Sequence, residues 1–292
     1  MTKLYISVIL FFGFILTLSG QTTDTTTTYT VGDSLEDALQ YQTGTIELKN
    51  GLGTVRIPPG FQFLNGTDSR MVLRDFWGNP DDVSVLGMII PAGKGVVRDD
   101  SWAFIVTYDE IGFVEDDDAE DIDYEELLEI MKEEMVEGNE ERVKAGYEKI
   151  GLIGWATPPS YNADKKILFW AKELKFGDAP ENTLNYNVRI LGRKGVLVLN
   201  AVGNMSQFKE INAQVPKVLD IVTFKKGNTY ADFNPDVDEV AAWTIGGLVA
   251  GKVLAKVGIL AFFGKFLKVI IVAIVAGAGA LWKWIKGRKE ES

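Results

Sequence analysis

Residues 184–201 read LNYNVRILGRKGVLVLNA, and this stretch decides the fold. From residue 184 to residue 191 apolar and polar side chains alternate, a period of two that is typical of a half-buried strand. The apolar positions are Leu184, Tyr186, Val188 and Ile190, and the polar ones are Asn185, Asn187 and Arg189. Turn residues at 192–195 lead into a second apolar run at 196–201, which predicts a hairpin with antiparallel pairing.

Further short apolar runs predict buried strands at residues 85–90, 102–107 and 167–171. Apolar stripes at helical spacing predict one helix from Asp123 and another from Asn204 or Ser206. Pro216 should kink the second helix or divide it into two pieces. Strands with segregated helices predict an α+β fold with a mixed, largely antiparallel sheet.

Composition excludes several kinds of chemistry. The chain has 292 residues, 46% of them apolar, a net charge of −11, and neither Cys nor His. Disulfides, thiolate nucleophiles, Cys/His zinc sites and Ser-His-Asp triads are therefore ruled out. Most of the negative charge lies within residues 21–238, which argues against nucleic acid as a partner.

The N-terminal residues predict export. Residues 1–20 carry Lys3, an apolar run and two small residues at the end, which is the pattern of a cleaved signal peptide. The alternative is an uncleaved anchor. Residues 21–30 are rich in Thr and predict a spacer. The globular domain is then expected over residues 31–238, outside the cytoplasm.

The C-terminal residues predict a membrane anchor. Residues 262–284 form an apolar run long enough to span a bilayer, provided that Lys265 and Lys268 lie at its outer edge. Trp282 and Trp284 would then lie at the opposite interface. The basic tail, residues 285–292, makes that end cytoplasmic by the positive-inside rule. A single-pass protein of the cell (inner) membrane is expected.

Residues 239–261 are apolar and rich in Gly but contain Lys252 and Lys256, and they predict an amphipathic, interfacial helix that leads into the span. The rival is a second span. A weaker hypothesis is that residues 240–284 form a channel or a lipid-active segment.

Three motifs could carry chemistry, and each has a plainer explanation. Residues 115–123 are acidic but lack the Gly that a calcium loop needs, so a solvated loop that leads into a helix N-terminus is expected. Ser206 and Lys209 match S-x-x-K without the companion motifs of penicillin-binding enzymes. Residues 91–95 lack phosphate-loop spacing, and a β-turn is expected there.

A cluster of aromatic and Arg residues has two interpretations, ordinary packing in the core or a recognition surface. Its members are Trp155, Tyr161, Tyr186, Arg189 and Arg193. Trp170, on an apolar strand, is expected in the core. Packing explains Arg189 least, because it lies on the polar face of its strand. The sequence assigns no catalytic residue, no cofactor and no metal ligand.

Several motifs together resemble an uncharacterised membrane-anchored family, called domain of unknown function 2167. The matching stretches are residues 148–161, 168–174, 184–193, 227–233 and 238–251. Trp243 stands where Tyr is expected, a mild departure. The resemblance implies a prokaryotic membrane-anchored protein, and it implies no activity.

The first functional hypothesis is therefore an anchored extracytoplasmic binding or scaffolding protein. Its expected partners are the lipid bilayer, through the C-terminal helix, and a protein or a second copy of the chain. The alternative is an envelope hydrolase, since Asp and Glu are the main acid–base candidates without His or Cys. Eligible carboxylates are Asp81, Asp82, Glu148 and Glu173.

Overall fold

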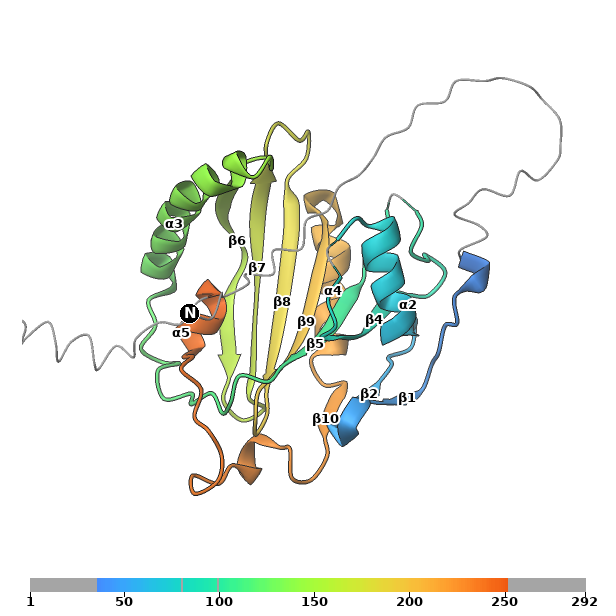
Figure 1. Ribbon diagram of the computed structural model, residues 1–292, viewed down its shortest axis with the longest axis vertical. Coiled ribbons are helices and arrows are strands. Elements are labelled where there is room, and N and C mark those ends of the chain that lie inside the picture. Colours follow the sequence, from blue (N-terminus) through green and yellow to red (C-terminus); the bar gives the residue numbers. More distant parts are fainter. Residues whose placement is uncertain (1–35, 80, 99, 252–292) are drawn as a thin grey trace, which may run out of the picture.

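A seven-stranded antiparallel sheet forms the centre of the protein (Figure 1). The computed structural model describes residues 36–79, 81–98 and 100–251. The strand order is β3-β4-β5-β9-β8-β7-β6, and every neighbouring pair is antiparallel. The strands are β3 (Phe61–Asn65), β4 (Val85–Pro91), β5 (Phe104–Asp109), β6 (Ile150–Asn162), β7 (Ile167–Phe176), β8 (Thr183–Leu191) and β9 (Val196–Asn204).

A smaller antiparallel sheet, four α-helices, the helical residues 36–38 and short 3-10 and π-helical segments complete the described part of the fold. The small sheet has the order β1-β2-β10, with β1 (Thr45–Glu47), β2 (Gly53–Arg56) and β10 (Val222–Phe224). The helices are α2 (Gly66–Met71), α3 (Tyr124–Lys144), α4 (Phe208–Val218) and α5 (Ile245–Ala250). The predicted α+β class and antiparallel pairing are confirmed.

The predicted hairpin is β8 and β9, and its register fixes which side chains share a face. Tyr186 pairs with Ala201, and both lie in the core beneath α4 and the small sheet. We call this side of the large sheet the α4 face. Asn187 pairs with Asn200 on the opposite side, which we call the α3 face. The predicted alternation along residues 184–191 is therefore correct.

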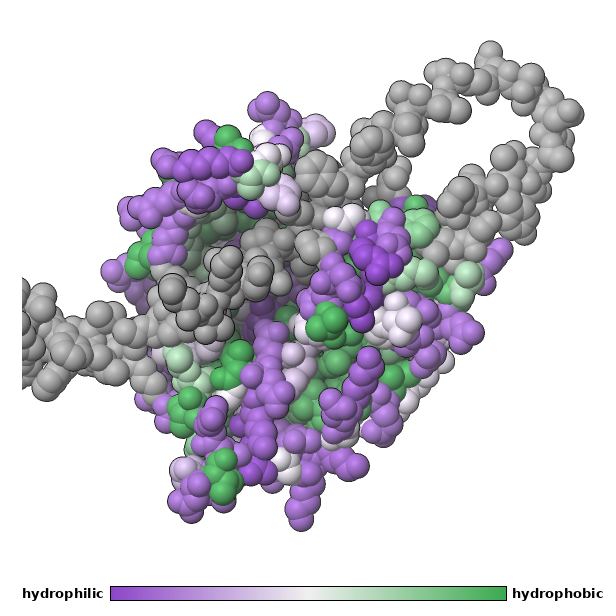
Figure 2. All heavy atoms as spheres, in the orientation of Figure 1, coloured by the Kyte–Doolittle hydropathy of each residue, from purple (hydrophilic) through white to green (hydrophobic). Residues whose placement is uncertain are grey.

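Two separate apolar clusters cover the α3 face. At the β6 and β7 end, α3 and α5 pack on the sheet through residues such as Leu128 and Ile245. At the β4 end, α2 and the turn that follows it pack through residues such as Val72. Figure 1 shows α3 and α5 on one side and α2 on the other, with β8 and β9 between them. The outer surface of α3 is hydrophilic (Figure 2).

Strand β6 is the long edge strand that sequence periodicity does not reveal. It contains Gly151, Gly154, Pro158 and Pro159, and its pairing with β7 shifts register three times. Pro and bulges are typical of edge strands because they hinder pairing with another chain.

Helix α4 is not divided at Pro216. It continues from Phe208 to Val218 with Pro216 in its last turn. Pro216 has no N–H to donate to the carbonyl four residues before it, so the helix loses one hydrogen bond without being divided. The helix is preceded by a 3-10 turn, Met205–Gln207, which Asn204 caps together with Gln207.

Helix α5 ends the described part of the chain. Asp118 accepts hydrogen bonds from the backbone N–H groups of Ile245 and Gly246 (3.1 and 3.2 Å), and Gly251 ends the helix with φ +76°. Within the predicted interfacial helix, residues 239–244 are not helical. The predicted signal peptide, spacer and span at 262–284 lie outside the described residues. Among the residues described, no helix has the length and apolar character to cross a bilayer.

A buried amide joins α3 to the start of β6. The Asn139 side chain donates to the Ile150 carbonyl and accepts from the Ile150 N–H, both at 2.8 Å. We expect Asn139→Ala to lower the free energy of unfolding of the full chain by about 2 kcal/mol, since two buried backbone groups lose their partners. Denaturant titration measures this change. The exposed neighbour Glu140→Ala is the control, with an expected effect within about 0.5 kcal/mol. Equal losses of stability in Asn139→Ala and Glu140→Ala would contradict a stabilising role for the Asn139 amide.

Candidate functional site

A line of polar side chains crosses the α3 face between the two apolar clusters. Register places Trp170, Asn187, Asn200 and Ile105 side by side across four strands. Lys172 lies directly across from Asn185 in the next row. We call the following set the polar strip: Trp170, Lys172, Asn185, Asn187, Arg189 and Asn200. Because these positions alternate with core residues on the same strands, the strand pattern that builds the core also positions the strip.

The asparagines of the polar strip form a hydrogen-bonded ladder. Asn200 Nδ2 donates to Asn187 Oδ1 at 2.9 Å, and Asn187 Nδ2 donates to Asn185 Oδ1 at 2.7 Å. Asn187 is only 4% exposed, so its amide depends on these partners. The ladder therefore holds the side chains of the two outer asparagines in defined orientations.

Arg189 lies over the Trp170 ring, with its guanidinium carbon 5.2 Å from the ring centroid. Its hydrogen bond within the described residues is a long one, 3.4 Å, to the Val188 carbonyl. No carboxylate of the described chain lies within ion-pair distance of it. Burial lowers the pKa of Arg189 to about 10, although the negative charge of Asp109 acts against this shift.

Lys172 is the second cation of the polar strip. Its ammonium group has no hydrogen bond or ion pair within the described part of the chain. Burial, and secondarily repulsion by Arg189, lowers the pKa of Lys172 to about 8. The two cations thus repel each other in a largely desolvated place, which costs folding free energy.

The five residues of the predicted recognition surface do not share one face. Trp155 and Tyr161 lie on β6 beside the polar strip, partly buried in the apolar cluster of α3 and α5. The Trp155 indole donates a hydrogen bond to the Tyr124 carbonyl. Tyr186 is buried on the α4 face, and Arg193 pairs with Asp238 at 2.7 Å. Of the five, Arg189 alone joins the polar strip. Trp170 is buried, as expected for a core residue, and also lies in the strip.

Sequence reasoning missed Lys172 and Asn200. One signal was present: Leu168, Trp170 and Leu174 recur at period two, and Lys172 occupies the same face of that strand. A Lys in an apolar register on a central strand is unusual, because burial of an unpaired charge is unfavourable. Asn200 interrupts the apolar run of β9 in the same way.

The acidic run at residues 115–123 is occupied by structural contacts. Asp116 accepts from Tyr161, Lys166 and Tyr230 at 2.6, 2.7 and 2.9 Å. Asp118 holds the first turn of α5, and Asp123 caps α3 as predicted. Within the described ranges no group of three metal-ligating side chains is arranged to hold an ion.

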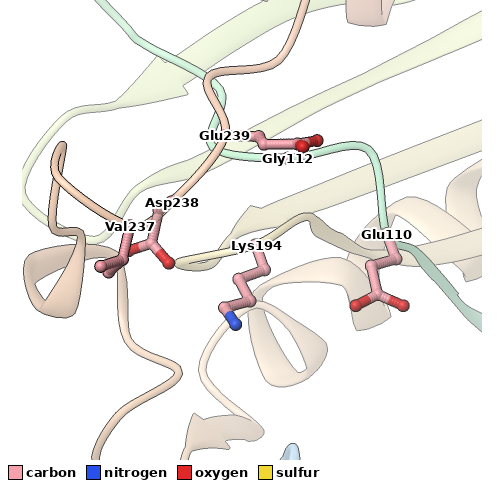
Figure 3. A pocket seen from close by; sticks show the side chains of 6 residues that line it. All are labelled: Glu110, Gly112, Lys194, Val237, Asp238 and Glu239. Carbon is pink, nitrogen blue, oxygen red and sulfur yellow. The ribbon is translucent and has the colours of Figure 1, made fainter.

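A small open pocket lies where the β8–β9 turn meets residues 237–239 (Figure 3). Its volume is about 250 Å³, and its lining includes Glu110, Lys194 and Asp238. Figure 3 shows the Lys194 side chain between those of Asp238 and Glu110. The hydrogen bond from Arg193 lowers the pKa of Asp238, which makes this carboxyl a poor general acid.

The carboxylates proposed for hydrolysis lie elsewhere. Asp81 pairs with Arg70 at 2.5 Å, Asp82 accepts from the Ser84 N–H, and Glu173 accepts from Asn182. Neither these three nor Glu148 lines the pocket of Figure 3.

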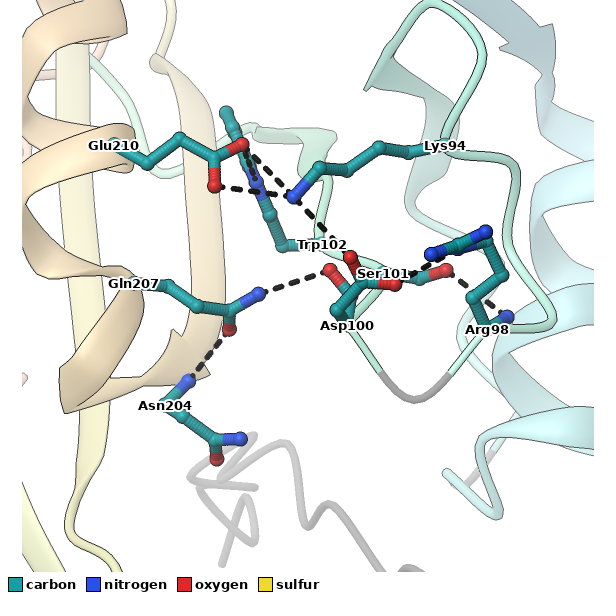
Figure 4. Close-up of polar contacts among 8 residues, drawn as sticks. All are labelled: Lys94, Arg98, Asp100, Ser101, Trp102, Asn204, Gln207 and Glu210. Carbon is teal, nitrogen blue, oxygen red and sulfur yellow. Dashed lines mark hydrogen bonds and ion pairs between the residues drawn. The ribbon is translucent and has the colours of Figure 1, made fainter.

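A second polar cluster ties the loop after β4 to α4 (Figure 4). Lys94 lies 3.0 Å from a carboxylate oxygen of Glu210, and the Trp102 indole donates to the same carboxylate at 3.0 Å. Gln207 donates to the Asp100 carbonyl at 2.9 Å. Residues 91–95 form the expected turn. Within this turn, the Lys94 ammonium forms the ion pair with Glu210.

A family described as a protein of unknown function, DUF2167, has a model that matches residues 40–279. No curated protein matches the chain. Similar solved structures include cyanobacterial PsbP from Synechocystis (10% identity, 64% of this chain and 92% of that chain, TM-score 0.35). LpqN, involved in cell envelope biogenesis of Mycobacterium tuberculosis, has 13% identity, covers 68% and 99%, and has a TM-score of 0.30. The Saccharomyces cerevisiae Ran-binding protein Mog1p has 14% identity, covers 61% and 84%, and has a TM-score of 0.29.

The unpaired charge of Lys172 predicts a gain in stability when it is removed. We expect Lys172→Met to raise the free energy of unfolding by about 1 kcal/mol at pH 7, because the desolvated ammonium is replaced by an apolar side chain. The folded-state pKa of Lys172 is lowered to about 8. The penalty is therefore complete below pH 8 and disappears as the pH rises to the unfolded pKa of about 10.4.

Denaturant titrations of the unmodified chain and of Lys172→Met, at pH 7 and pH 10, measure the difference in the free energy of unfolding. The exposed Lys209→Met on α4 is the matched control, with no expected gain. A loss of stability in Lys172→Met at pH 7 would show that the ammonium has a stabilising partner.

Proposed function

The chain belongs to DUF2167, a family of unknown function, and for this member we propose a role as an anchored binding or scaffolding protein. The described domain would lie outside the cytoplasm, and the polar strip would be its binding surface. One observation carries the proposal. Among the residues that the structure describes, Lys172 and Arg189 have no ion-pair partner on a sheet face where apolar side chains would cost less to bury.

Perturbed ionisable groups without structural partners favour a functional site over a structural one. Other charged side chains of the described chain form hydrogen bonds or ion pairs that hold structural elements in place. Asp118 holds the first turn of α5, Arg193 holds Asp238, and Lys94 ties a loop to Glu210. The polar strip has no comparable duty, because its two cations contact no carboxylate of the described chain.

The position of the polar strip also suits binding. The α4 face is covered by α4 and the small sheet, whose side chains fill one continuous core. On the α3 face the two apolar clusters lie on either side of the polar row of Asn187 and Asn200, in the middle of β8 and β9, although the far ends of these strands belong to the cluster of α3 and α5 (Figure 1). Asn185, Arg189 and Lys172 are each partly exposed there. A partner could therefore reach the strip without displacing a core element.

Anchoring rests on the sequence. The apolar run at residues 262–284 and the basic tail at 285–292 support a single C-terminal span with a cytoplasmic end. The pattern of residues 1–20 supports export of the domain that follows. With this topology the polar strip would meet partners in the extracytoplasmic space.

Site-directed photo-crosslinking tests the binding surface. With benzoylphenylalanine in place of Asn185 in the full chain, we expect a discrete adduct in native membranes after irradiation. The same probe in place of Lys209, exposed on α4, is the control and should give no matching species. Adducts of equal intensity from both positions, or from position 209 alone, would contradict the polar strip as the binding surface.

Cysteine labelling tests the topology, because the chain has no Cys of its own. We expect Lys209→Cys to react with a membrane-impermeant maleimide in spheroplasts, since α4 would lie outside. Lys286→Cys, in the basic tail, should react only after the membrane is permeabilised. The reverse pattern would contradict the extracytoplasmic assignment while leaving the polar strip unaffected.

A further inference from the structure

The unused hydrogen-bonding groups of the polar strip are mostly donors, and the buried acceptor without a partner in the described chain is Asn200 Oδ1. The Trp170 ring is 1% exposed, and its Nε1–H has no acceptor among the described residues. The Lys172 ammonium also lacks an acceptor there. Arg189 uses one of its five N–H donors, in the long contact to Val188. A ligand that fits this set must supply acceptors.

The direction of the asparagine ladder adds another donor. Asn187 Nδ2 donates both to Asn185 Oδ1 and to the Asn185 carbonyl, at 2.7 and 3.3 Å. Only a nitrogen can make both contacts, so the amide of Asn187 is fixed and Asn185 must present its oxygen to it. Asn185 Nδ2 is therefore the end of the amide that points away from Asn187, and Asn185 lies directly across the strands from Lys172.

On the premise that the polar strip is the binding surface, we propose that it binds an oxyanion, a carboxylate or phosphate group, between Lys172 and Arg189. Charge-assisted hydrogen bonds from ammonium and guanidinium to such oxygens are about twice as strong as neutral ones. A bound anion would also relieve the repulsion between the two cations, which lowers the pKa of Lys172.

Neutral and cationic ligands fit this site less well. A neutral polar ligand would leave two desolvated cations uncompensated, and a cationic one would add to their repulsion. Asp109 is the carboxylate whose charge acts on Arg189, but it lies beyond ion-pair distance and burial raises its pKa. The anion that the polar strip lacks must therefore come from outside the described chain.

The test uses the full chain in nanodiscs of phosphatidylcholine, with inorganic phosphate and citrate as probes. We expect either anion to raise Tm relative to sodium chloride at equal ionic strength, with saturation in the millimolar range or below. Lys172→Met and Arg189→Met should weaken the apparent affinity about tenfold or more. Arg189→Lys should also weaken it, because Lys lacks the planar fork that lies over Trp170.

Lys194→Met is the matched control, since Lys194 is an exposed cation in the β8–β9 turn outside the polar strip, and it should bind as the unmodified chain does. Nanodiscs with phosphatidylglycerol distinguish the source of the anion. A strip-dependent Tm rise in those discs, without a response to phosphate or citrate, would identify a lipid headgroup.

If no anion and no lipid gives a response above sodium chloride, the oxyanion inference is wrong. The same holds if Lys194→Met weakens binding as much as Lys172→Met. Neither result would contradict the binding surface itself, which photo-crosslinking at position 185 tests separately. Since Lys172→Met is expected to gain stability, its loss of binding could not be attributed to unfolding.

Discussion

The register between β7, β8, β9 and β5 is the constraint on which the rest of the structure depends. Side chains alternate between two faces, and a slip of one residue would exchange the faces of every side chain on a strand. With the observed register, Tyr186 enters the core under α4 while Asn187 and Arg189 lie on the opposite side. The same backbone hydrogen bonds therefore position both the core side chains and the polar strip.

Charged side chains at the ends of the strands have several hydrogen-bond partners, whereas those along the α3 face have few. At the ends, Asp116, Asp118 and Asp238 each receive two or more hydrogen bonds, and these contacts hold loops and helix termini in place. Along the α3 face, Lys172 and Arg189 have neither a carboxylate partner nor a full set of acceptors among the residues that the structure describes. Such a contrast within one domain indicates that stability alone does not explain the polar strip.

Much of the fold could be predicted from sequence, and the reasons are local. The hairpin of β8 and β9 shows alternation and a turn, the strands at residues 85–90 and 167–171 are short apolar runs, and α3 begins at the capping residue Asp123. Strand β6 shows no such pattern, because Gly and Pro replace the alternation that a central strand would show.

The candidate site was only partly visible in the sequence. Arg189 stood out because it lies on the polar face of a strand that alternates cleanly. Lys172 and Asn200 did not, since their contact with Arg189 and Asn187 depends on pairing between strands and not on local pattern. Tyr186 and Arg189 are close in the sequence, and this proximity placed them in one predicted surface. They are three residues apart on one strand, however, so their side chains lie on opposite faces of the sheet.

The attachment of α5 has a mechanical consequence for an anchored chain. Tension applied beyond Gly251 would act first on this short helix, whose first turn is held by the carboxylate of Asp118. Asp118 lies two residues from Asp116, which is tied to Tyr161 on β6 and to Lys166 just before β7. In a chain anchored beyond Gly251, a pull would therefore pass through these two carboxylates to the β6 and β7 edge of the large sheet.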